Sequence, residues 1–192
     1  HFTLHALRLH RLLAQRAAPR VLDFGCGHGE FVAVCRTLGL DAHGIDWAVD
    51  RREHGLVQIH PSLDSLRASA AFDAVTLFEV LEHLAEPRQA LERLTALMTP
   101  GAVLVLETPD TTRVTDLRSF DDYLAIAPLG HINGFTPASL RAIAERAGFR
   151  AIVPPPVWVA DSWREAAKSC ARNLIARWRR PTTSQTFVLD RR

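Results

Sequence analysis

The chain has 192 residues and a formal net charge of +2; 47% of its residues are hydrophobic and 23% are charged. This length suits one α/β domain, and this composition excludes a disordered chain, collagen and a coiled coil. No apolar run approaches the roughly 18 residues that span a membrane, so no transmembrane segment is expected. The three cysteines are too few for a disulfide framework and indicate a reducing compartment, which predicts a cytoplasmic protein.

The first half of the chain alternates helical periodicity with short apolar runs. Histidines and arginines interrupt residues 2–15, so no signal peptide is expected, and His1 in place of an initiator methionine predicts a processed or trimmed chain. The elements expected in this half are a helix at 3–17 that ends before Pro19, strands at 21–24, 42–46, 56–59 and 72–78, and helices at 31–38 and 87–98.

The second half continues the alternation. Pro100 and Gly101 predict a turn, and Thr136 is expected to cap a helix. The elements expected here are strands at 102–106, 149–153 and 186–189, helices at 137–147 and 161–180, and an irregular stretch at 110–130 with one helix. Strands that alternate with helices predict a doubly wound parallel sheet with helices on both faces, whose ligands bind at the carboxyl ends of the strands.

A glycine-rich loop follows the first expected strand. Gly25, Gly27 and Gly29 allow the backbone to turn tightly and to approach a ligand closely. A dinucleotide-binding loop has a third glycine where this chain has Glu30, and an acid at the start of a helix repels phosphate. Asp23 adds a second negative group. The loop is therefore expected to bind a cationic ligand rather than a pyrophosphate.

Asp46 ends the second expected strand, about twenty residues after the loop. An acid at this place in such a fold binds the hydroxyls of a ribose. The alternative interpretation is a tight turn followed by an aspartate that caps a helix. Cys26, between two loop glycines, is interpreted as a small side chain that fits there.

Several segments resemble, in order, the motifs of class I S-adenosylmethionine-dependent methyltransferases. The resemblance implies a Rossmann-like sheet of seven strands whose last strand is antiparallel, and it implies S-adenosylmethionine as the cofactor. The matching segments are residues 21–31, 43–46, 72–75, 79–84, 99–105, 130–136 and 147–149.

The resemblance also implies the contacts of the cofactor. The backbone of the glycine loop, with Cys26, would hold the methionine part, and Asp46 would bind the ribose beside Trp47. The main chain of Phe78 would face the methionine amino group, with Glu79 next to it.

The contact of the adenine departs from the family pattern. Family members usually carry an aspartate after the third strand, where this chain has Ser62. Ser62, the backbone of Leu63 and Asp64 are therefore alternative adenine contacts.

An acidic and histidine cluster follows the fourth expected strand. Glu79, Glu82 and His83 share one face if the chain is helical there. In one interpretation His83 or His131 is a general base for an acceptor hydroxyl. In a second, these four side chains bind Mg²⁺ or Mn²⁺, as the matching residues do in ubiquinone-type O-methyltransferases and small-RNA 2′-O-methyltransferases, which this pattern resembles. In a third, Glu79 contacts the cofactor, Glu82 caps a helix and His83 packs.

The predicted function is O-methylation of a small-molecule hydroxyl by in-line transfer, with deprotonation assisted by histidine or metal. Residues 108–135 are expected to cover the acceptor. Metal-dependent methylation of RNA is the first alternative, and the lack of a basic body argues against it. A nicotinamide-dependent oxidoreductase is disfavoured by Glu30, and a non-catalytic cofactor-binding domain is disfavoured by the intact loop and Asp46.

One domain is expected, with an N-terminal helix at 3–17, a cofactor-binding core at 20–153 and a basic helical insertion at 157–183. Residues 161–180 carry six positive and two negative side chains, whereas the rest of the chain is slightly acidic, which argues against bulk binding of nucleic acid. This helix is interpreted as a lid, a homodimer contact or a peripheral surface for acidic lipid or an anionic acceptor; the alternative is a helix packed on the sheet with a solvated basic face.

Overall fold

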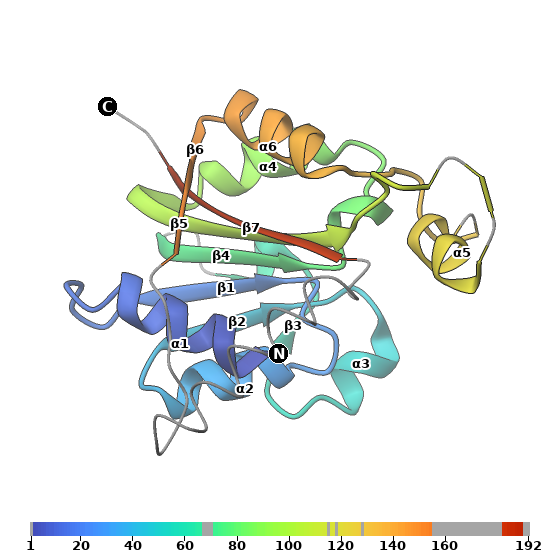
Figure 1. The fold of residues 1–192 in the computed structure, drawn as a ribbon. Coiled ribbons are helices and arrows are strands. Elements are labelled where there is room, and N and C mark those ends of the chain that lie inside the picture. The colour runs from blue at the N-terminus through green and yellow to red at the C-terminus, as the bar shows by residue number, and fades with distance from the viewer. Residues whose placement is uncertain are drawn as a thin grey trace, which may run out of the picture.

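The computed structural model describes residues 2–66, 71–114, 116–117, 119–127, 129–154 and 182–189. In this part of the chain a seven-stranded sheet has the order β3-β2-β1-β4-β5-β7-β6 (Figure 1). Only β7 runs antiparallel to its neighbours among these strands, which confirms the predicted fold class. The strands are β1 (Arg20–Phe24), β2 (Asp41–Ile45), β3 (Ile59–His60), β4 (Phe72–Phe78), β5 (Met98–Pro109), β6 (Phe149–Ile152) and β7 (Thr182–Leu189).

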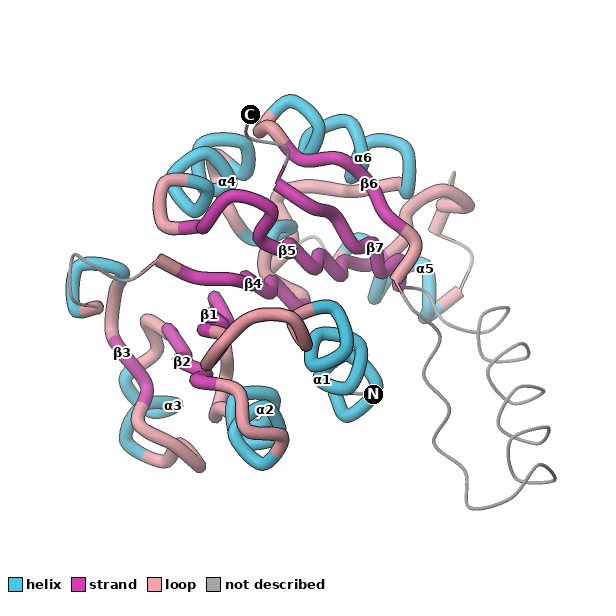
Figure 2. The backbone as a smooth tube through the Cα atoms, turned by 90° about the vertical axis from the view of Figure 1, so that its left-hand side faces the viewer, coloured by secondary structure: helices cyan, strands magenta, loops and turns pink. Residues whose placement is uncertain are grey.

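Helices cover both faces of the sheet (Figure 2). On one face α1 and α2 enclose a core with Leu9 and Phe31, and on the other α4 and α6 enclose a core with Leu91 and Leu140. The helices are α1 (Phe2–Leu12), α2 (Glu30–Thr37), α3 (Val49–Glu53), α4 (Pro87–Thr95), α5 (Phe120–Ile126) and α6 (Pro137–Arg146), with 3-10 turns η1 (Leu63–Ser65) and η2 (Leu81–His83).

The strand order places a switch point between β1 and β4. After β1 the chain adds β2 and β3 on one side, and after β4 it adds β5 on the other. Loops that follow neighbouring parallel strands at such a point open a crevice at the carboxyl edge of the sheet. The loops after β1, β2, β3 and β4 therefore meet at this edge, while α5 projects away from the sheet (Figure 1).

The first helix is shorter than predicted. It ends at Leu12 rather than at residue 17. The chain turns after Leu12 and brings Arg16 to the starts of β4 and β5. There the Nη1 atom of Arg16 donates to Asp73 at 2.6 Å and to Thr99 at 2.9 Å. The other Asp73 oxygen accepts from the Arg20 amide at 2.9 Å. These tertiary bonds, rather than a proline, end the helix.

Two predicted boundaries near residue 100 are also wrong. The helix expected at 87–98 ends at Thr95, and Met98 already belongs to β5, where it pairs with Phe72. The expected turn at Pro100 and Gly101 is an irregularity inside β5, because the register against β4 shifts there and Gly101 has φ of 70°.

Other differences concern short or late elements. The helix α3 was not predicted, β3 is a pair of residues, and β7 begins at Thr182 rather than at residue 186. By contrast, Thr136 caps α6 as predicted, since its hydroxyl accepts from the Ser139 amide at 3.1 Å. The expected helix at 161–180, which is the centre of the basic insertion at 157–183, lies outside the described residues.

Candidate active site

The loop after β1 has a backbone that requires glycine. Gly25, Gly27 and Gly29 have φ of 79°, 59° and 86°, in the left-handed region that other residues rarely adopt. A Cβ atom on Gly25 would overlap the side chain of Val80, and one on Gly29 would lie 2.6 Å from Cγ2 of Val57. The predicted cofactor loop is therefore a tight turn packed against the segments that follow β4 and precede β3.

Asp46 lies directly beneath this loop and is fully buried. Its Oδ2 atom accepts from the Gly27 amide at 3.0 Å, and its Oδ1 atom accepts from the Ala48 amide at 2.9 Å. The guanidinium of Arg51 reaches Oδ2 at 3.2 Å, and Arg52 donates to the main-chain oxygen of Asp46 at 3.1 Å. The acid predicted to bind a ribose thus holds the glycine loop in place.

Beside Asp46, partly exposed side chains line the carboxyl edge of the sheet. Trp47 is 53% exposed, and its ring is tilted against Phe24 with centroids 6.2 Å apart. The three alternative adenine contacts follow β3: Ser62 and Asp64 are exposed, whereas Leu63 packs partly against the core. Together these side chains offer both an apolar surface and polar groups.

Two predicted site residues are enclosed by the protein. Asp23 is buried in β1 and accepts from the Thr76 hydroxyl at 2.6 Å, and burial raises the pKa of its carboxyl to about 7. Burial also raises the pKa of the Cys26 thiol to about 12. A thiol with such a pKa is a poor nucleophile, and Cys26 packs where Gly44 leaves room.

At the end of β4, Phe78 and Glu79 lie next to the N-terminal helix. The Phe78 ring contacts Phe2, Phe31 and His5, with centroids 5.5, 4.9 and 5.0 Å away. Glu79 has φ of 55°, so the chain leaves β4 in a left-handed turn and not in a helix. The predicted helical face of Glu79, Glu82 and His83 is therefore wrong, because only residues 81–83 form a helical turn.

A buried pair that the sequence analysis missed lies behind Glu79. The Nε2 atom of His5 lies 3.2 Å from Oε2 of Glu107, and both side chains are buried. The main-chain oxygen of Glu107 accepts from the Glu79 amide at 2.9 Å. Glu107 interrupts an otherwise apolar strand, so the sequence could have indicated it as a functional candidate. Nothing in the sequence marks His5 as its partner.

The carboxyls at this place repel one another. Burial raises the pKa of Glu79 to about 7, with further contributions from the nearby Glu82 and Glu107. Burial likewise raises the pKa of Glu82 to about 7, and Glu107 adds to the shift. Near neutral pH these two carboxyls exchange protons readily.

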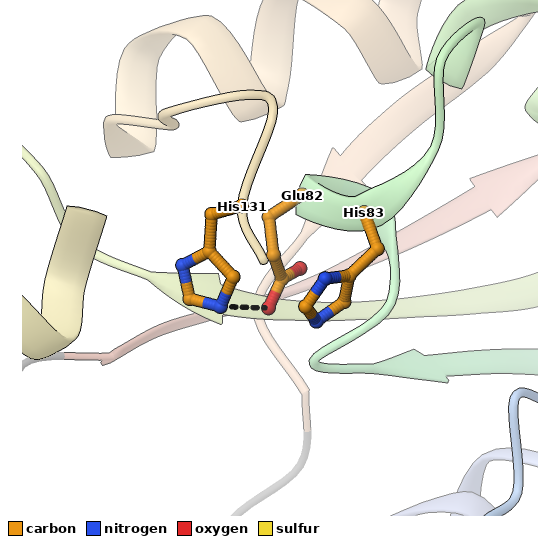
Figure 3. A group of neighbouring side chains, drawn as sticks. All are labelled: Glu82, His83 and His131. Carbon is orange, nitrogen blue, oxygen red and sulfur yellow. Dashed lines mark ion pairs between the residues drawn. The ribbon is translucent and has the colours of Figure 1, made fainter. Parts of the chain in front are cut away.

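Glu82 and His83 of η2 converge with His131, which comes from a distant loop (Figure 3). One ligand atom from each lies within 4.8 Å of the others. Glu82 is 1% exposed, neither of its carboxylate oxygens has a hydrogen-bond partner among the described residues, and Nε2 of His131 is 4.0 Å from Oε1. Glu79, the fourth predicted ligand, is not part of this group of three.

Main-chain bonds fix the position of His131. The amides of Ile132 and Asn133 both donate to the Glu82 main-chain oxygen at 3.0 Å. His83 contacts the main-chain oxygen of Gly130 through Nδ1 at 2.8 Å. Since a carbonyl only accepts, Nδ1 carries the proton in the neutral ring, and Nε2 is left as the acceptor or ligand atom.

Comparison with known proteins identifies the family. A family model described as "Methyltransferase domain" matches residues 2–153, which is well over half of the chain. The chain belongs to this family and is a class I S-adenosylmethionine-dependent methyltransferase, as the sequence motifs predicted.

Individual relatives agree with this. The ubiquinone biosynthesis O-methyltransferase of Xanthomonas axonopodis pv. citri (strain 306) is 32% identical over 195 residues, covering 90% of this chain and 81% of that protein. The protein of the same name from Xanthomonas campestris pv. campestris (strain B100) is 37% identical over 126 residues, covering 57% and 53%.

Solved structures share the fold. A SAM-dependent methyltransferase from Archaeoglobus fulgidus has a TM-score of 0.65 at 23% identity, covering 98% of this chain and 94% of that one. Phosphoethanolamine N-methyltransferase 2 of Haemonchus contortus, in complex with S-adenosyl-L-methionine, has a TM-score of 0.66 at 15% identity, covering 98% and 52%. In the described part of this chain, no helix is both long enough and apolar enough to cross a membrane.

Proposed function

We propose that the protein methylates a hydroxyl of a small molecule, and that Glu82, His83 and His131 assist the loss of the hydroxyl proton. The observation that carries this proposal is the buried carboxylate of Glu82 between two imidazoles at the carboxyl edge of the sheet. The name of the relatives, O-methyltransferase, supports oxygen as the acceptor atom.

The residues present fit S-adenosylmethionine. When bound, it supplies a methyl group on a positively charged sulfur. The left-handed glycine loop offers main-chain groups at close range, and Asp46 would bind the ribose hydroxyls. The main chain of Phe78 would face the amino group, and Glu79 adds negative charge beside it. Ser62, Leu63 and Asp64 stand on the side where the adenine would lie.

Deprotonation needs a group whose protonation changes near neutral pH. His83 has Nε2 available, because Nδ1 is engaged by the Gly130 carbonyl. Glu82 stabilises the imidazolium that forms when a neighbouring histidine takes the proton. Positioning of the acceptor oxygen supplies the rest of the rate enhancement.

A divalent ion is a second way to lower the pKa of the hydroxyl. A carboxylate and two imidazoles within 4.8 Å suit Mn²⁺ or a similar ion, and the two orphaned oxygens of Glu82 would gain a partner. Glu82, His83 and His131 would hold the ion, and it would polarise the acceptor oxygen.

Residues 108–135, which are expected to cover the acceptor, carry exposed apolar side chains. Phe120 and Tyr123 on α5 stack with centroids 6.4 Å apart, and both rings are exposed, as are Leu124, Leu129 and Ile132. Exposed apolar groups in such number mark a surface for an apolar or aromatic ligand. These side chains support a phenolic small molecule over RNA.

The test is a methyl-transfer assay with phenols, catechols and a short RNA as acceptors, with and without chelator. Glu82→Gln should lower kcat about 100-fold, while the affinity for S-adenosylhomocysteine changes less than about threefold. Glu92→Gln, an exposed glutamate on α4, is the matched control and should keep full activity. Equal activity of Glu82→Gln and wild type would reject the role of the cluster, and methylation of RNA alone would reject the acceptor class.

A further inference from the structure

The carboxylate of Asp46 already has nearly all the partners that it can accept. A carboxylate oxygen has two lone pairs, and Oδ2 receives the Gly27 amide at 3.0 Å and Nη1 of Arg51 at 3.2 Å. Oδ1 receives the Ala48 amide at 2.9 Å and keeps one lone pair. If the two ribose hydroxyls donate to different oxygens of Asp46, one hydroxyl can use the free lone pair of Oδ1. The other hydroxyl needs the lone pair of Oδ2 that Arg51 occupies.

We propose that Arg51 occupies the place of a ribose hydroxyl and that binding of the nucleoside displaces it from Asp46. This inference rests on the proposed role of Asp46 as the acid that binds the ribose. Arg51 then lowers the affinity for the cofactor, although it lies outside the ribose-binding motif.

Of the groups around Asp46, Arg51 is the one that can leave. The two amides belong to the glycine loop and to the start of α3, so the backbone holds them. The Arg51 side chain is 50% exposed and reaches Asp46 from the solvent side of a helix of five residues. Its neighbour Arg52 is bound differently, because it donates to the main-chain oxygens of Asp46 and Trp47 at 3.1 and 2.6 Å.

The arrangement has a physical reason. A fully buried carboxylate without a counter-charge is costly, and the protein itself buries Asp46 fully. Arg51 neutralises this charge, and the ribose hydroxyls would take over part of this role when they bind. The ion pair stabilises the empty site and competes with the ligand, so its removal has opposite effects on the two.

The experiment measures binding by calorimetry, without turnover. Arg51→Met keeps the length of the side chain and removes its charge; we expect S-adenosylhomocysteine to bind it about three- to tenfold more tightly than wild type. Because this ligand has no net charge, the gain does not reflect lost repulsion. Adenosine should gain by the same factor and 2′,3′-dideoxyadenosine should not, since the latter lacks the hydroxyls that displace Arg51.

Two controls separate the causes. Arg93→Met, an exposed arginine on α4, removes the same charge and should leave every affinity and the melting temperature unchanged. The unliganded Arg51→Met protein should melt at a lower temperature than wild type. If it does not fold, Arg51→Lys, which keeps the charge but reaches Asp46 less well, should still bind S-adenosylhomocysteine more tightly than wild type.

An unchanged or weaker affinity of Arg51→Met for S-adenosylhomocysteine overturns the displacement. An equal gain for 2′,3′-dideoxyadenosine overturns it as well, because the effect would not pass through the ribose. Asp46→Asn tests the underlying assignment separately: if it binds S-adenosylhomocysteine as tightly as wild type, Asp46 does not hold the ribose, and both proposals about this residue fail.

Discussion

The two halves of the carboxyl edge are built in opposite ways. On the cofactor side, the glycine loop and Asp46 come from a short stretch of chain, and the buried carboxylate has a partner on each oxygen. On the side that we propose for the acceptor, Glu82 and His131 come from distant segments, and the buried carboxylate of Glu82 has no hydrogen-bond partner within the described part of the chain.

This difference matches the two tasks. A binding loop must be rigid before its ligand arrives, so its own backbone and Asp46 stabilise it. A group that moves a proton needs an unsatisfied carboxyl with a pKa near neutrality, and burial beside other acids provides this. The glycine loop is therefore held by its own hydrogen bonds, whereas among the described residues neither oxygen of the Glu82 carboxylate accepts a hydrogen bond.

The largest expected effect is on the rigid side. Gly25→Ala adds a left-handed residue and a Cβ that overlaps Val80, and we expect a loss of about 4 kcal/mol in the free energy of unfolding. Gly39→Ala is the matched control, since Gly39 has the same φ of 79° with no atom near its Cβ, and should lose only about 1 kcal/mol.

The denaturation measurement has an internal check. Gly25→Ala combined with Val80→Ala should be more stable than the two separate losses predict, because the smaller side chain removes the overlap. Equal losses for Gly25→Ala and Gly39→Ala would mean that packing against Val80 does not shape the loop.

The next effect concerns Asp23, whose pKa is raised by burial from 3.8 to about 7. Between these values the unfolded chain has lost the proton and the folded chain keeps it, so the free energy of unfolding falls as the pH rises from about 4 to 7. Asp23→Asn should remove this fall and be more stable than wild type by up to about 4 kcal/mol at pH 8, with no gain at pH 4.

The contrasting variant is Asp73→Asn. Asp73 is paired with Arg16 and with the Arg20 amide, so the same change there should lower stability at pH 8. A loss of stability in Asp23→Asn at pH 8 would show that the carboxylate is stabilised by its surroundings rather than penalised by burial.

The smallest effect concerns the acceptor side. Because the pKa of Glu79 and Glu82 is raised to about 7, kcat should fall roughly tenfold per unit as the pH drops below 7. Glu107→Gln removes an acid that raises the pKa of both carboxyls, so the acid limb of the profile should move down by less than about one unit. If the acid limb of the kcat profile stays in place, or if it lies near the ordinary glutamate pKa of about 4.5, the neighbouring carboxyls do not shift one another's pKa.

Much of the fold followed from local patterns. The apolar run of β4 ends at Phe78 as predicted, and Thr136 starts α6, since periodicity and capping act over a few residues. The end of α1 was not predictable, because it depends on Arg16 reaching Asp73 across 57 positions. Likewise, α3 is a helix of five residues, too short to leave a periodic signal.

The site divides in the same way. The amino-acid sequence by itself determined the glycine loop and the place of Asp46, because these residues form a local motif whose geometry follows from backbone conformation. Only the tertiary structure decided the acceptor side: it brought His131 to Glu82 and His83, left Glu79 outside the group, and paired His5 with Glu107. These contacts join segments far apart in the chain, and their positions depend on the packing of the whole sheet.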